Sequence, residues 1–226
     1  MSGALVDLYE AGFERRWLQA ADQLAGRMVA DFWDRQHGGF FYTSSAHQNL
    51  LVRTRPLYDG PVPSGNATAA LVLLRLSKLL DHQEYFSKAE HLLASTAEGM
   101  RAQPGAHLSL LCAADFYLRP TREIVIAGRR HRDDTRRLLE VIHRRFIPNK
   151  ILALPEPDGD SRLAEPDVPI LAGKHMISGN AAVYVCENFT CRQPAIDTTP
   201  LEKILDEAIY LGQVLPTSSA ANSKDK

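Results

Sequence analysis

Residues 67–80 (ATAALVLLRLSKLL) are apolar on nearly every side of the helix that they would form. Arg75 and Lys78 are the only charged residues in this stretch. A helix that is apolar all round must be buried all round. The stretch therefore predicts a helix in the inner layer of a double-layered helical assembly.

The segments around this stretch carry apolar residues at the three-to-four-residue spacing of amphipathic helices. Residues 4–11 are expected to be the end of a helix, and further helices are expected from Phe13 to about Asp34, from Asp81 to Met100 and from His107 to Leu118. Residues 1–119 thus predict about five helices, alternately fully buried and amphipathic, as in stacked αα-hairpins of a solenoid or toroid. Residues 37–66 interrupt them with paired glycines, aromatic residues and prolines, which predict a β-hairpin and an ordered loop.

The period of the hydrophobic pattern changes at Pro120. Residues 123–127 (EIVIA) and 150–154 (KILAL) are short apolar runs typical of buried parallel strands, with a helix between them capped by Asp133 or Asp134. Strand, helix and strand form a βαβ unit, and residues 181–186 are a third candidate strand. We expect a mainly α protein with helical hairpins over 1–119, a small α/β lobe over 120–215 and a tail over 216–226 that is too polar to pack.

Charge and composition exclude several classes of function. The formal net charge is −1 and acidic and basic residues are interspersed, so neither nucleic acid nor an anionic membrane is an expected partner. No run of about 18 apolar residues predicts a transmembrane helix, and the first residues lack the long apolar segment of a secretory signal. A cytoplasmic location is expected. Cys112, in an apolar helical stretch, predicts a buried and inert thiol.

The segment Arg53–Asn66 (RTRPLYDGPVPSGN) is the strongest candidate for a site. Arg55, Asp59, Ser64 and Asn66 place polar groups just before the buried helix, whose unpaired N–H groups attract a polar ligand. Asp59 suits a general acid or base, and Arg55 suits its ion-pair partner or a substrate anion. The alternative is an ordered loop in which Arg55 and Asp59 pair and Ser64 caps the helix.

Aromatic residues lie close to this segment in the sequence. A stacking surface for a sugar ring would use Phe40, Tyr42 and Tyr58, together with Phe41. These residues predict a small carbohydrate-like ligand.

Two cysteines, Cys186 and Cys191, are spaced C-x4-C and not C-x-x-C, which disfavours a thioredoxin-type pair. Two structural thiols close in space are the favoured interpretation, and a redox or disulfide pair comes next. A zinc site comes last, because His175 is the only further ligand nearby in the sequence. We expect no metal and no cofactor.

Three motifs, GGFFYT, RPLYDGPVPSGNATAALVLLRL and YVCENFTCRQP, carry a family resemblance over nearly the whole chain. The chain resembles the C-terminal part of the YyaL and spermatogenesis-associated thioredoxin-like family. The resemblance implies a six-hairpin α/α toroid, similar to glycosidases and sugar epimerases, after an N-terminal thioredoxin-fold domain. This chain matches neither that domain nor the first hairpins, so the resemblance implies a partial toroid. It also implies that Asp59, Pro63, Ser64, Gly65 and Asn66 line the central cavity.

Two hypotheses of function follow. The first is carbohydrate binding or glycosidase- or epimerase-like processing by the parent protein, with this chain alone inactive. A glycosidase needs two carboxylates, and Asp34 is a weaker second beside Asp59. The second is a non-catalytic scaffold that supports a thioredoxin-like domain or binds a partner protein. A partial toroid would also leave a helix face uncovered, which predicts self-association or instability of the isolated chain.

Overall fold

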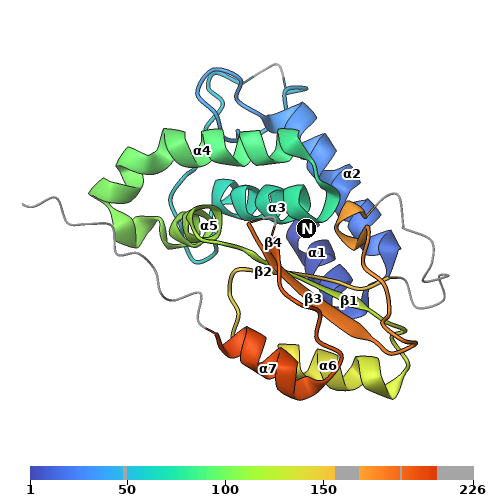
Figure 1. Cartoon of the computed structure of the whole chain (residues 1–226). Coiled ribbons are helices and arrows are strands. Elements are labelled where there is room, and N and C mark those ends of the chain that lie inside the picture. The colour runs from blue at the N-terminus through green and yellow to red at the C-terminus, as the bar shows by residue number, and fades with distance from the viewer. Residues whose placement is uncertain (48–49, 156–167, 189, 208–226) are drawn as a thin grey trace, which may run out of the picture.

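The structure is a computed structural model that describes residues 1–47, 50–155, 168–188 and 190–207. The stretch predicted to be buried on all sides is helix α3 (Gly65–Leu80), which lies in the middle of the helical part (Figure 1). Its Leu73, Leu76 and Leu79 are fully buried. The other helices of this part are α1 (Ser2–Gly12), α2 (Arg15–Phe32), α4 (Gln83–Ala102) and α5 (Leu108–Leu118). Helices α4 and α5 pack along α3, and α1 packs along α2, so the predicted helical hairpins are confirmed.

The period change at Pro120 marks the start of a four-stranded sheet with the order β2-β1-β3-β4. The predicted βαβ unit is confirmed, because β1 and β2 pair in parallel and α6 lies between them in the chain. Strand β3 pairs antiparallel with β1, and β4 pairs antiparallel with β3, so the sheet is mixed and not purely parallel. The elements are β1 (Arg122–Ala127), α6 (Asp133–His143), β2 (Lys150–Ala153), β3 (Ala182–Glu187), β4 (Thr190–Cys191) and α7 (Thr198–Asp206).

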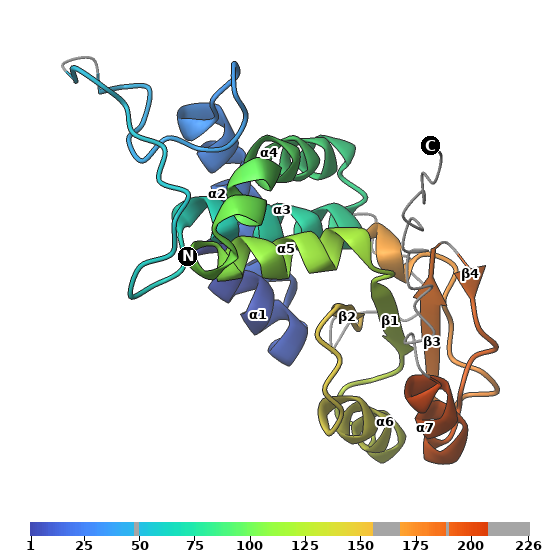
Figure 2. The ribbon, with the colours of Figure 1, turned by 90° about the vertical axis from the view of Figure 1, so that its left-hand side faces the viewer.

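The sheet is covered on both faces (Figures 1 and 2). Alternate residues of a strand point to opposite faces. Ile124 and Val185 pack with residues of α6 and α7 on one face, whereas Val125 and Ile151 join the core of the helical part on the other. One face of the sheet therefore shares a hydrophobic core with α1 to α5, and the other face forms a second core with α6 and α7.

The segment from Trp33 to Ser64, which we call the 33–64 loop, is not the predicted β-hairpin. Its described residues contain one isolated bridge, between Trp33 and Phe40, and no regular strand. Prolines at positions 56, 61 and 63 cannot donate to a strand ladder. Side chains at the base of the loop bind its backbone groups instead, as described below.

The prediction for Cys112 is also wrong, because this residue is exposed. Leu110, Ala113 and Phe116 of α5 face the core at helical spacing, which turns Cys112 outward. The polar tail, 216–226, lies outside the described residues. None of the helices in the described part of the chain is long and apolar enough to cross a membrane.

Candidate functional site

Asn66, in the first turn of α3, binds two separate parts of the 33–64 loop. Its Nδ2 donates to the carbonyl oxygens of Phe40, at 2.9 Å, and Pro56, at 2.8 Å. Its Oδ1 accepts the N–H of Phe40 at 2.6 Å, and the residue is only 2% exposed. A buried amide that satisfies three backbone groups fixes the loop to the helix.

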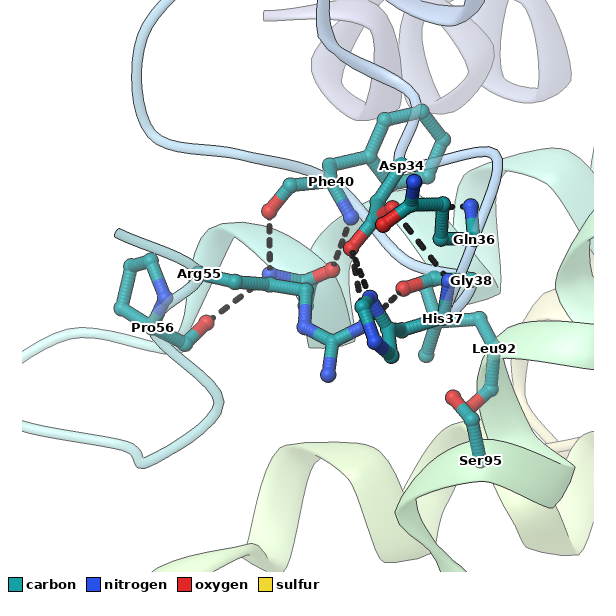
Figure 3. A network of polar contacts seen from close by, with 10 residues as sticks. Asp34, Gln36, His37, Gly38, Phe40, Arg55, Pro56, Leu92 and Ser95 are labelled. Atoms are coloured by element: carbon teal, nitrogen blue, oxygen red, sulfur yellow. Dashed lines mark hydrogen bonds and ion pairs between the residues drawn. The ribbon is translucent and has the colours of Figure 1, made fainter. Parts of the chain in front are cut away.

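Asp34 organises the beginning of the same loop (Figure 3). Its Oδ1 accepts the N–H groups of Gln36, at 2.9 Å, and His37, at 3.2 Å. Its Oδ2 lies 3.4 Å from Nη1 of Arg55, which also donates to the carbonyl oxygen of Gly38. Burial opposes ionisation of Asp34, but the N–H groups of Gln36 and His37, together with the His37 ring 3.2 Å from Oδ2, outweigh it and hold the pKa of the carboxyl below its usual value. Arg55 therefore pairs with Asp34 and not with Asp59.

Asp59 joins the N-terminal ends of two helices. Its Oδ1 accepts the N–H of Ser64, just before α3, at 2.8 Å, and its Oδ2 accepts the N–H of Ser109, in the first turn of α5, at 2.7 Å. Burial opposes ionisation, but the two N–H donors outweigh it and lower the pKa of Asp59. Helix N-termini favour a negative charge, so a carboxylate at this place stabilises both helices.

Ser64 is the N-cap of α3, as the alternative interpretation of the sequence predicted. Its Oγ accepts the N–H of Ala67 at 3.1 Å, and its backbone is extended. This hydrogen bond satisfies one of the free N–H groups at the helix start.

The aromatic residues proposed as a sugar platform have separate surroundings. Phe40 is buried and packs edge-on against Trp33, with ring centres 5.1 Å apart. Tyr58 rests on His107 at 4.8 Å, and Tyr42 is 75% exposed. No ring contact among the described residues joins Phe40, Tyr42 and Tyr58 to one another.

A polar pocket of about 520 Å³ lies between α2 and α4, at residues that the sequence did not single out. The rings of His82 and Tyr85 stack there at 4.0 Å, and Lys88 lies 4.7 Å from the centre of the Trp33 ring. Burial and the neighbouring Asp22 raise the pKa of Tyr85, whose hydroxyl donates to Asp22 at 2.8 Å. The pocket is lined by Gly26, Val29, Ala30, Trp33, Arg35, His82, Glu84, Tyr85 and Lys88. Its lining residues come from two chain segments far apart in the sequence, α2 with the residues just after it and the start of α4 with His82 before it, so no local motif marked the pocket.

Cys186 and Cys191 are joined by a disulfide, the second of the sequence-based interpretations. The carbonyl oxygen of His175, the further zinc ligand considered, accepts a hydrogen bond from the Tyr184 hydroxyl at 2.8 Å. Within the described residues, no group of three or more His, Cys, Asp or Glu side chains is placed to hold a metal ion.

Comparison with known proteins confirms the family resemblance carried by the motifs. The chain is 36% identical to spermatogenesis-associated protein 20 of Homo sapiens over 202 residues, which are 89% of this chain and 26% of that protein. It is 36% identical to the Rattus norvegicus protein of the same name over 205 residues, and 24% identical to an uncharacterized Caenorhabditis elegans protein over 205 residues. No protein-family model matches the chain. The chain thus spans about a quarter of the length of these relatives, consistent with the C-terminal part of that family.

Proposed function

We propose that this chain, a relative of spermatogenesis-associated protein 20 over about 90% of its own length, is a non-catalytic interaction module. Its helices and sheet form a rigid body that presents the 33–64 loop to the rest of a longer protein. One observation carries the proposal: the base of the loop is held by buried polar side chains, while several of its large apolar side chains are exposed.

Several large apolar side chains of the 33–64 loop are exposed to solvent. Leu51 is fully exposed, and Tyr42, Val52 and Val62 are 75%, 73% and 71% exposed. The described part of the loop extends away from the helices on the side opposite the sheet (Figure 2). Exposed apolar patches on a fixed backbone are typical of a surface that another protein segment covers.

The rest of a longer protein is the occupant that we propose. The relatives are about four times as long as the matched segment, so they hold ample chain to cover the loop. In this proposal α1 to α5 are part of an α/α toroid, and the covering segments are further helical hairpins or a thioredoxin-like domain.

The surroundings of the two carboxyls considered for glycosidase chemistry, Asp34 and Asp59, favour an interaction module over a catalytic domain. A glycosidase needs one carboxylic acid with a raised pKa to protonate the leaving group. The pKa values of both Asp34 and Asp59 are lowered, and both side chains bind backbone N–H groups with their oxygens. Neither residue suits the general acid.

Self-association of the isolated chain tests the interaction surface. We expect its mass in light scattering to rise with concentration, because copies cover each other's exposed loops. The triple variant Leu51→Ser, Val52→Ser, Val62→Ser should remove most of this rise and leave the thermal unfolding midpoint unchanged, since these side chains are exposed.

Phe146→Ser is the matched control, because Phe146 is 92% exposed but lies in the α/β lobe, outside the loop. It should self-associate like the original chain. A chain that stays monomeric at every concentration, or a control that loses association as fully as the triple variant, would count against the loop as the interaction surface.

Sugar binding is a second candidate, and the pocket between α2 and α4 supports it. Stacked rings beside charged groups suit a sugar, which presents both apolar faces and hydroxyls. Isothermal titration with a panel of mono- and disaccharides is expected to give saturable binding that Glu84→Gln weakens, because Glu84 lines the pocket. Asp133→Asn, on the exposed start of α6, is the control and should bind as the original chain does. If none of the sugars binds saturably, the proposal of sugar binding is wrong.

A further inference from the structure

The disulfide between Cys186 and Cys191 joins the last two strands of the sheet. The two cysteines are direct partners in the pairing of β3 with β4, with Cα atoms 3.9 Å apart. The N–H of Arg192 donates to the carbonyl oxygen of Val185 at 3.0 Å, so the cysteine pair occupies the next, non-hydrogen-bonded position. Side chains of an antiparallel pair come closest there.

The two ends of this disulfide differ in access. Cys186 is 3% exposed and pairs on its other side with Glu123 of β1. Cys191 is exposed and lies on the short edge strand β4. Thiol–disulfide exchange depends on which sulfur a thiolate can reach. The exposure therefore directs attack to Cys191 and makes Cys186 the leaving sulfur.

Contacts other than the disulfide also hold β3 in place. Val183 and Ala195 exchange two backbone hydrogen bonds, of 2.8 and 3.0 Å, which tie β3 to the segment after β4. Val183 and Val185 also belong to the core formed with α6 and α7. A disulfide that closes so short a loop restricts the unfolded chain less than one that closes a long loop, so it contributes less to stability. Opening it does not require the sheet to unfold.

Residues beside the two cysteines connect them to the end of α7. Glu187 accepts from Nε of Arg122 at 3.0 Å, and Arg122 donates to the carbonyl oxygens of Leu205, at 2.6 Å, and Glu207, at 2.7 Å. Arg192, next to Cys191, pairs with the Glu207 side chain. These contacts link the hairpin to the segment where α7 ends.

We propose that the Cys186–Cys191 disulfide is a redox site that exchanges reversibly with a dithiol. One thiolate of the dithiol attacks Sγ of Cys191, forming a mixed disulfide, and Cys186 leaves as a thiolate that takes up a proton. The second thiolate of the reductant then attacks the reductant's other sulfur, which is bonded to Cys191 in the mixed disulfide. Cys191 is released as a thiolate and is protonated in turn. The protein gains two electrons and two protons, and the dithiol becomes a disulfide.

Alkylation of the folded chain tests reduction. We expect a Cys112→Ser variant, which removes the exposed free thiol, to bind no maleimide before treatment and two maleimides after dithiothreitol. The near-UV circular dichroism of its core should persist, and oxidised glutathione should restore the unreactive state. Reduction that requires urea concentrations high enough to unfold the chain would overturn the proposal, because the disulfide would then be a structural bond only.

Single-cysteine variants test the direction of attack. In the Cys112→Ser background, Cys186→Ser leaves only Cys191 and Cys191→Ser leaves only Cys186. Cys191 should react with an aromatic disulfide reagent at least about tenfold faster than Cys186, because access limits exchange. Circular dichroism of both variants checks that each is folded. An equal or faster reaction at Cys186 in a folded variant would overturn the assignment of Cys191 as the attacked sulfur.

Discussion

Asn66→Asp is expected to lower the free energy of unfolding by about 3–5 kcal/mol, because it leaves a buried charge without compensation. The original Nδ2 donates to the carbonyl oxygens of Phe40 and Pro56. A carboxylate oxygen in its place would face two acceptors and repel both. Urea unfolding followed by circular dichroism measures the loss.

The pH dependence of this loss identifies its cause. Burial and the two carbonyl oxygens should raise the pKa of the introduced carboxyl. A raised pKa in the folded state favours the protonated form, so the difference between the variant and the original chain should shrink as the pH falls from 7 to 5.

Gln19→Glu makes the same amide-to-carboxylate change at an exposed position of α2. It should change the free energy of unfolding by no more than about 0.5 kcal/mol. If Asn66→Asp unfolds at the same urea concentration as this control, Asn66 does not hold the loop.

Asp59→Ala is expected to lower the free energy of unfolding by about 2–4 kcal/mol, because two N–H groups lose a charged acceptor. These are the N–H groups of Ser64 and Ser109, at the starts of α3 and α5. Asp59→Asn keeps one acceptor oxygen and should lose roughly half as much. A catalytic Asp59 without a capping role would leave the unfolding free energy nearly unchanged in both variants.

Measuring the free energy of unfolding as a function of acid pH distinguishes the contribution of the Asp59 charge from other effects of the substitution. The lowered pKa of Asp59 means that its stabilisation is fully present above pH 3.8, the usual pKa of an aspartate, and is lost as the pH falls through the pKa of the folded state. The advantage of the original chain over Asp59→Asn should therefore narrow below pH 3.8.

Asp133→Ala is the matched control, since Asp133 also lies at a helix start but its side chain is 88% exposed. Its effect should stay within about 0.5–1 kcal/mol. A control as destabilised as Asp59→Ala would mean that helix-dipole charge alone, and not the two specific hydrogen bonds, accounts for the result.

Local pattern predicted most elements of the fold. The apolar stretch of α3, the amphipathic helices around it and the βαβ unit all follow from hydrophobic periodicity, which reports how a segment is buried. The 33–64 loop was predicted as a hairpin because its aromatic residues have strand propensity. Strand propensity depends on neighbouring strands, and none lies beside this segment among the described residues.

The candidate site was harder to predict than the elements. The alternative interpretation of Ser64 as a helix cap is confirmed, and it could be made from the sequence because a cap bonds to a residue only three positions further on. Arg55 was expected beside Asp59 but lies against Asp34, which is 21 residues away in the sequence. The pocket between α2 and α4 was missed for the same reason, since two separate helices line it.

The amino-acid sequence is enough to predict that α3 is an inner helix, that a βαβ unit follows Pro120, and which family the chain resembles. These conclusions rest on local periodicity and on motifs. The tertiary structure alone decided that Asp59 binds Ser109, 50 residues away, and that Asn66 binds Phe40, 26 residues away. Hydrogen bonds act only over about 3 Å. Their partners are therefore set by how distant segments pack, which no local pattern records.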